Sequence, residues 1–274
     1  MRARHAAGSE RLMEFLHNIN PLYSLSGLLI GVLVGFVGVG GGSLMTPLLV
    51  LLFGVHPATA VGTDLLYAGL TKIGGTAVHA RNDAVDWRIT RRLAAGSAPA
   101  AALTLIGLSW FGRDSQAMSQ VITTTLGVSL IITAVALIFR AWLLARVAKA
   151  IDALSDRQIR LLTNLLGGAL GVLVSISSVG AGAIGVTVLL MLYPRLPTVK
   201  IVGSDIAHAV PLTLIAGAGH WWTGAVDWAL LASLLIGSLP GIALGSQMAS
   251  RVPEGVLRPV LAGTLAVVGV MVAI

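Results

Sequence analysis

Apolar stretches long enough to cross a lipid bilayer recur along the chain, and this feature restricts the fold more than any other. A transmembrane helix needs about 20 mostly apolar residues to span the ~30 Å hydrocarbon core. Such blocks occupy, in chain order, residues 22–53, 58–80, 94–111, 119–139, 161–193, 200–222, 229–248 and 256–274. Only 11% of the 274 residues are charged, whereas a soluble domain carries about 25%. The sequence therefore predicts an all-α polytopic membrane protein with about eight transmembrane helices.

The basic residues, which give the chain a formal net charge of +7, lie mainly between these blocks. Cytoplasmic loops of membrane proteins carry such an excess, so the charge predicts topology and not nucleic-acid binding. We expect the strongly charged segment 141–160, the Arg81–Arg92 loop and both termini in the cytoplasm, which requires an even number of crossings in each half. The predicted organisation is a cytoplasmic leader at 1–21, a first transmembrane repeat at 22–140, a cytoplasmic linker at 141–160 and a second transmembrane repeat at 161–274.

The two halves of the chain are related by a sequence repeat. A shift of 141 residues aligns VGTD (61–64) with VGSD (202–205), and AVDW (84–87) with AVDW (225–228). Chance similarity between apolar segments would match scattered Ala, Leu and Val, but it would not align Asp, His, Trp and Pro together. We therefore predict two homologous halves, each crossing the membrane four times and both in the same orientation. Internal repeats are typical of secondary transporters.

A glycine-rich run interrupts the first apolar block, in the sequence GFVGVGGGSLMTP (35–47). A P-loop would need a lysine, and a dinucleotide-binding fingerprint a glycine, where Ser43 stands, so both patterns fail. Because glycine permits positive φ, the run predicts a helix that unwinds and restarts. Four crossings in each half then require 43–53 and 182–193 to be short re-entrant segments. The second half has a matching run, SISSVGAGAIG (175–185). A restarted helix presents free N–H groups that favour an anion, while close helix packing by small residues is the alternative interpretation.

We therefore expect a small anion to bind at the two broken first segments. No catalytic residue, metal site or cofactor is predicted. The candidate substrate-binding residues are Gly38, Gly40, Gly41, Gly42, Ser43, Thr46, Thr63, Lys72, Ser177, Ser178, Gly180, Gly182 and Ser204.

Few ionisable residues lie within the predicted spans. Asp64 and Asp205 occupy matching positions of the repeat, and such acids are costly at membrane depth unless they have a function or cap backbone N–H groups. Lys72 lies eight residues after Asp64, about 12 Å along a helix, and is free to meet an anion or a partner helix. His208 lies one turn after Asp205. The proton-coupling candidates are therefore Asp64, Asp205 and His208, with a structural hydrogen-bonded pair as the alternative for Asp205 and His208.

Each half contains, in this order, a glycine-rich helix break, a G-[ST]-D segment and a VDW loop. In this order of features the chain resembles the sulfite exporter TauE/SafE family. The resemblance covers the chain from Leu22 to its last residue. It implies a multi-pass carrier in the bacterial inner membrane for small anions, often sulfur oxyanions or organosulfonates such as sulfite and sulfoacetate, commonly in the direction of export. Family members often have an uncharged residue where Asp64 and Asp205 stand, so the coupling ion is not transferred from the resemblance.

The sequence thus predicts a secondary transporter, an exporter by resemblance, that works by alternating access and is not an enzyme; proton coupling stays open. A passive anion channel would use the same helix ends. An intramembrane hydrolase could nominally pair Ser43 with His79 or His208, but no G-x-S-x-G motif surrounds Ser43. The expected partners are a small anionic substrate and the lipid bilayer, and the sequence is also compatible with a homo-oligomer.

Overall fold

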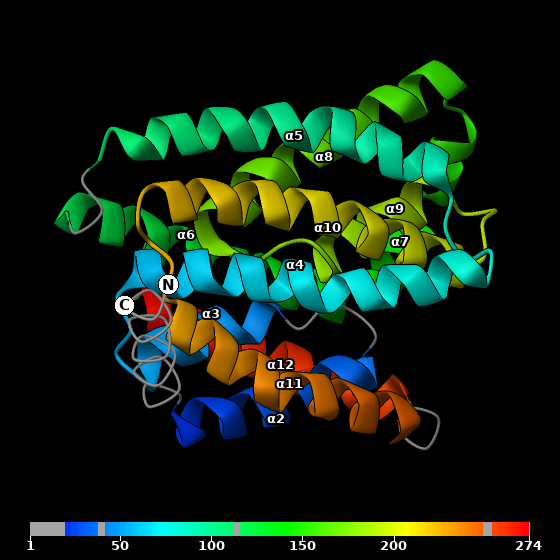
Figure 1. The fold of residues 1–274 in the computed structure, drawn as a ribbon. Coiled ribbons are helices and arrows are strands. Elements are labelled where there is room, and N and C mark those ends of the chain that lie inside the picture. The colour runs from blue at the N-terminus through cyan, green and yellow to red at the C-terminus, as the bar shows by residue number, and fades with distance from the viewer. Residues whose placement is uncertain (1–19, 38–41, 112–114, 249–253, 274) are drawn as a thin grey trace, which may run out of the picture.

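The computed structural model describes residues 20–37, 42–111, 115–248 and 254–273, and all regular structure in these ranges is helical. The long helices lie side by side along one common direction (Figure 1). They are α2 (Pro21–Val37), α3 (Gly42–Leu51), α4 (Pro57–Arg81), α5 (Trp87–Ser109), α6 (Gln116–Ile138), α7 (Arg140–Asp152), α8 (Asp156–Ser177), α9 (Ala183–Leu192), α10 (Thr198–Trp222), α11 (Trp228–Met248) and α12 (Glu254–Ala273). The predicted all-α class is confirmed.

Four of the described helices are long and apolar enough to cross a membrane, namely α6, α8, α10 and residues Trp228–Gly245 of α11. α4 and α5 reach similar lengths, but polar and charged residues lower their hydropathy. Large apolar side chains are exposed within several helices, as expected of a surface in contact with lipid. Examples are Ile106, Ile132, Leu165, Ile236 and Val267. These findings support a multi-pass membrane protein, while the number of eight spans stays a prediction.

Exposed tryptophans lie at both ends of the helix bundle. Trp87 begins α5, and Trp142 lies near the start of α7. Trp110 follows α5, and Trp222 ends α10. Tryptophan is enriched where a membrane protein meets the lipid headgroups. We call the two ends of the bundle the Trp87 end and the Trp110 end.

The first two helices of each half form a hairpin. The hydroxyl oxygen of Tyr193, directly after α9, lies 2.8 Å from that of Thr163, near the start of α8. In the first half, the rings of Tyr23, near the start of α2, and Phe53, after α3, have centroids 4.8 Å apart. Each short helix therefore returns toward the end from which the preceding helix began.

Helices α4 and α10, which occupy matching positions of the repeat, run antiparallel side by side (Figure 1). Gly62, early in α4, lies against His220, late in α10, whereas Gly75 lies closest to Ile206. Repeats in the same orientation would require these helices to run in the same direction, so the expected parallel orientation is wrong. The physical reason is the hairpin: α2 and α3 together return to their own end, and the three long helices that follow finish at the other end.

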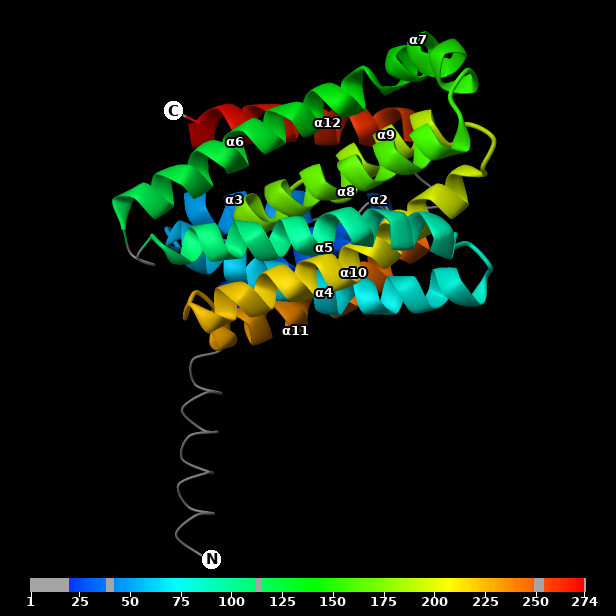
Figure 2. The ribbon, with the colours of Figure 1, turned by 90° about the horizontal axis from the view of Figure 1, so that it is seen from above.

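The linker helix α7 consequently lies at the Trp87 end (Figure 2), whereas α2 starts at the Trp110 end (Figure 1). The backbone N–H of Asn20 donates to Ser233 Oγ in the first turns of α11, at 3.2 Å. Residues 1–19 of the predicted leader 1–21 lie outside the described residues, and the side of the membrane on which the leader lies stays a prediction.

The largest buried apolar cluster lies where α4, α5, α8, α9 and α10 meet. Its fully buried members include Leu65, Leu93, Leu170, Leu189 and Leu212. The ionisable residues of the two halves are embedded in this region, so the core of the bundle also holds the candidate site.

Candidate functional site

The predicted helix break of the second half is present. α8 ends at Ser177, and α9 begins at Ala183. Between them Gly180 and Gly182 have φ values of +124° and +119°, and Ser178 has φ +60°. Positive φ strains a residue that has a Cβ atom, so the glycines are needed for the chain to reverse here. Ser178 adopts this conformation as a buried residue at the end of α8.

In the first half, α2 ends at Val37 and α3 begins at Gly42. Three of the predicted substrate-binding glycines, Gly38, Gly40 and Gly41, lie outside the described residues, as does the side chain of Ser43. Thr46, in the first turns of α3, is completely buried, and its hydroxyl donates a hydrogen bond of 2.5 Å to Asp64 Oδ2.

Both acids of the repeat are buried, and each lies against the start of a short helix. Asp64 contacts α3 through Thr46. Asp205 Oδ1 packs directly against Gly185 of α9, with no room for a Cβ atom there, and the backbone N–H of Gly182 interacts with the Asp205 carboxylate. One oxygen of each carboxylate, Oδ1, has no hydrogen-bond partner among the described residues. These acids therefore lie at the starts of α3 and α9, where the sequence predicted that an anion binds.

The second helix break also reaches the acid of the first half. Ser178 interacts with the Asp64 carboxylate, although its hydroxyl forms no hydrogen bond of good geometry with any described residue. Asp64 thus lies between α3 of its own half and the α8–α9 turn of the other half. The start of α3 and the α8–α9 turn therefore meet at Asp64.

Lys72 is the cation of this region. The half-buried Lys72 interacts electrostatically with both Asp64 and Asp205. It forms no ion pair with a described residue. One ammonium group therefore interacts with two carboxylates from opposite halves of the repeat. When both acids are ionised and Lys72 is protonated, the three side chains together carry a net charge of −1.

His208 is completely buried, and its Nε2 atom lies 2.8 Å from the hydroxyl oxygen of Ser97 in α5. Its Nδ1 atom has no partner among the described residues. The predicted pair of Asp205 and His208 is not joined by a hydrogen bond in the structure as described. His208 does lie within electrostatic range of Lys72. The proton-relay role of His208 stays a prediction.

Thr63 and Ser204, both predicted to bind substrate, instead hold a loop of the other half. The Thr63 hydroxyl accepts a hydrogen bond of 3.0 Å from the backbone N–H of Asp227. The Ser204 hydroxyl accepts one of 2.8 Å from the backbone N–H of Asp86. The two hydroxyls thus form matching contacts with loops of opposite halves, and their role in substrate binding stays a prediction.

Neighbouring glycines make these contacts possible. A Cβ atom on Gly62 would collide with the carbonyl oxygen of Ala225, and one on Gly203 with that of Ala84. Gly62 and Thr63 contact the 225–227 loop, and Gly203 and Ser204 contact the 84–86 loop. We call these the two cross-half contacts. One lies at the Trp110 end and the other at the Trp87 end, because they involve opposite ends of α4 and α10.

Sequence reasoning missed several buried polar groups. Ser97 was not considered, because a serine on a helix has no distinctive signal before its neighbours are known. Thr187 was also missed, although a shift of 141 residues matches it to Thr46 and could have identified it. Thr187 and Tyr67 have hydroxyls that are buried without a partner among the described residues. No group of three or more metal-ligating side chains occurs in the described parts of the chain.

Comparison with known proteins places these features in a family. A family model described as "Sulfite exporter TauE/SafE" matches residues 23–272. "Probable membrane transporter protein YjnA" of Bacillus subtilis (strain 168) is 37% identical over 248 residues, or 89% of this chain and 96% of the relative. "Probable membrane transporter protein MJ0441" of Methanocaldococcus jannaschii is 26% identical over 267 residues, or 91% and 93%. No solved structure was found to match the chain.

Proposed function

Since the chain belongs to the sulfite exporter TauE/SafE family, we propose that it exports a small anion, a sulfur oxyanion or an organosulfonate, by alternating access. The observation that carries this proposal is Lys72, a half-buried cation that interacts with the acids of both halves beside the helix breaks. An ammonium group without an ion pair can attract an oxyanion inside a membrane protein. Relatives named as probable membrane transporters support transport as the general function.

In the proposed site, backbone N–H groups at the starts of α3 and α9 bind the oxyanion together with the Lys72 ammonium. Helix N-termini favour anions because their first N–H groups have no partner within the helix. Discontinuous helices near the middle of a membrane serve this purpose in other transporters. The hydroxyls of Ser178 and Thr187, which have no partner among the described residues, are available as further donors.

We propose that the two halves are inverted repeats, since α4 and α10 run antiparallel. Inverted repeats suit alternating access because the same two packing arrangements can exchange between the two ends. The cross-half contacts fit this scheme: each joins α4 or α10 to a loop of the other half, through Thr63 to Asp227 and through Ser204 to Asp86. Opening one end would require breaking one contact, while the other holds the opposite end closed.

We place the Trp87 end in the cytoplasm of a bacterial cell, with the protein in its inner membrane. The strongly basic segments, the loop after α4 and the linker that contains α7, both lie at this end, and basic residues accumulate on the cytoplasmic side. The Trp110 end then faces outward.

The chain has no cysteine, so a single introduced cysteine reports the topology directly. Ser155→Cys, in the linker before α8, should resist an impermeant thiol reagent applied to intact cells. Thr223→Cys, an exposed residue after α10 at the Trp110 end, should react readily. Both should react after the cells are permeabilised, which controls for burial. Protection of both residues in intact cells would contradict inverted repeats.

Counterflow in proteoliposomes tests the function itself. Unlabelled sulfite trapped inside should accelerate uptake of labelled sulfite from outside, because a carrier exchanges its substrate while a channel does not. Sulfoacetate should be tried in parallel, with chloride as the negative control. Absence of acceleration together with a substrate-dependent current would favour a passive channel. The family is one of membrane transporters, which is consistent with a non-enzymatic function.

A further inference from the structure

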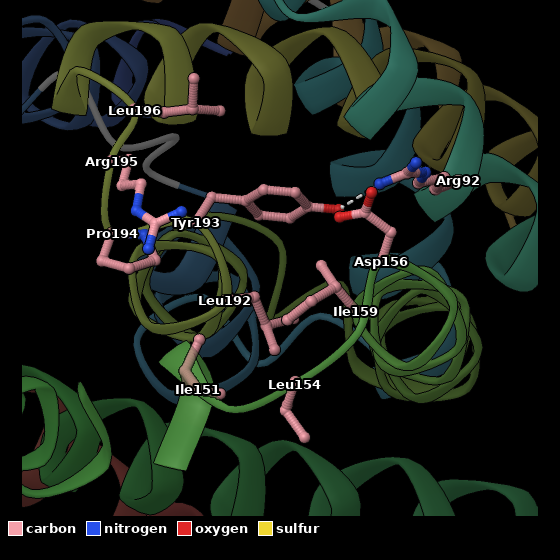
Figure 3. Close-up of a pocket in the computed structure, with 10 residues that line it drawn as sticks. All are labelled: Arg92, Ile151, Leu154, Asp156, Ile159, Leu192, Tyr193, Pro194, Arg195 and Leu196. Atoms are coloured by element: carbon pink, nitrogen blue, oxygen red, sulfur yellow. Dashed lines mark hydrogen bonds between the residues drawn. The ribbon is translucent and has the colours of Figure 1, made fainter. Parts of the chain in front are cut away.

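A pocket of about 200 Å³ opens at the Trp87 end, between the end of α7, the start of α8 and the segment that follows α9 (Figure 3). It is separate from the acids and Lys72 of the proposed transport site, none of which lines it. At the positions that match Tyr193 and Arg92 in the repeat, the chain has Leu52 and Ser233. The polar pair that lines this pocket is therefore not repeated at the other end.

One wall of the pocket is polar and basic. A guanidinium N–H of Arg92 donates a hydrogen bond of 3.0 Å to the hydroxyl oxygen of Tyr193, which in turn lies 2.8 Å from that of Thr163. Tyr193 thereby holds the Arg92 side chain in place while other N–H groups of the guanidinium remain to bind a ligand. Arg195 adds a second positive charge on the other side of the Tyr193 ring from Arg92, and the Asp156 carboxylate lies beside the place where Tyr193 meets Arg92 (Figure 3). Among the described residues that line the pocket, two are basic and one is acidic.

The remaining wall is apolar. Figure 3 shows Leu192 and Ile159 beneath the meeting point of Tyr193 and Arg92, with Leu154 and Ile151 of the α7 segment farther down. A soluble anion such as phosphate would leave this apolar surface uncovered. A ligand with both an anionic group and a hydrocarbon chain would use both walls.

The pocket also lies at the depth of lipid headgroups. Arg92 lies five residues after Trp87 on α5, about 7.5 Å along the helix, and exposed tryptophans mark the membrane boundary. Basic pockets between helices on the cytoplasmic side bind anionic lipid headgroups, and guanidinium groups suit phosphate geometry. We propose that this pocket binds an anionic phospholipid, whose headgroup extends past the Tyr193 ring between Arg92 and Arg195 and whose acyl chain lies against Ile159 and Leu192.

Lipid-dependent thermal unfolding of the purified full-length protein tests this proposal. Phosphatidylglycerol added to the detergent-solubilised protein should raise its unfolding temperature, whereas phosphatidylcholine should not. Arg92→Gln and Arg195→Gln should each weaken the apparent phosphatidylglycerol affinity about fivefold, the effect of one basic side chain near a membrane surface. Arg91→Gln is the matched control, since Arg91 is exposed on the same helix, bonds to the Trp87 carbonyl oxygen and does not line the pocket.

Each outcome decides the proposal. Equal stabilisation by the two lipids, or equal weakening by Arg91→Gln, would show general attraction to lipid and overturn it. Stabilisation by glycerol 3-phosphate as strong as that by phosphatidylglycerol would mark a site for a free phosphate instead. Arg195 is exposed, so Arg195→Gln keeps the test valid if Arg92→Gln fails to fold.

Discussion

Lys72→Met should weaken the apparent affinity for the transported anion by roughly 30-fold or more, since removing one partner of a buried charge pair costs about 2–5 kcal/mol. In the proposed site the Lys72 ammonium is the positive charge that offsets Asp64 and Asp205. Without it an anion would approach two carboxylates unaided. The measurement is the concentration dependence of sulfite counterflow in proteoliposomes, with the maximal rate and the half-saturating concentration determined separately.

The matched control for this variant is Lys200→Met. Lys200 forms a surface ion pair with Asp83, with its Nζ 3.1 Å from Asp83 Oδ2, and exposed pairs contribute about 1 kcal/mol or less to stability. Its loss should leave the half-saturating concentration unchanged. Lys72→Arg retains the charge and should keep most of the affinity. An unaltered half-saturating concentration in folded Lys72→Met protein would exclude Lys72 from the substrate site.

Asp205→Asn should make transport nearly independent of pH. With Asp64 and Asp205 ionised and Lys72 protonated, the group has a net charge of −1, which repels an anionic substrate. Binding of one proton removes this repulsion, so the wild-type affinity for the anion should rise as the pH falls, by up to about tenfold per pH unit if one proton binds with each anion. A neutral asparagine at position 205 removes one negative charge at every pH, so the affinity for the anion should no longer depend on protonation of this residue.

The other titratable groups around this acid must be separated from it. Lys72 on α4 interacts electrostatically with Asp205, and it also interacts with Asp64 and with His208. His208→Gln should therefore be measured beside Asp205→Asn, and Asp83→Asn, which removes an exposed acid, is the control. A wild-type pH profile in Asp205→Asn, combined with a lower unfolding temperature, would assign Asp205 a structural role. A profile flattened by His208→Gln alone would move the proton site to the histidine.

Much of the fold could be predicted from local sequence properties. The apolar blocks predicted helices and a membrane environment, because both depend on composition and on runs of adjacent residues. The SISSVGAGAIG run predicted the break between Ser177 and Ala183, because glycine readily adopts the φ values of +124° and +119° found at Gly180 and Gly182. The repeat also identified Asp64 and Asp205 as a matching pair. Each of these inferences concerns the chain near the residues that carry the signal.

Residues far apart in the sequence were placed only by the tertiary structure. The orientation of the repeats was misjudged because counting basic residues does not show that α2 and α3 fold back to their own end. Thr63 and Ser204 were assigned to the substrate, yet their hydroxyls accept hydrogen bonds from the backbones of Asp227 and Asp86. Apolar periodicity tells which residues prefer lipid or protein, but the partner of a buried hydroxyl depends on which helices pack together. Ser97 against His208, and Lys72 between two acids, follow from that packing alone.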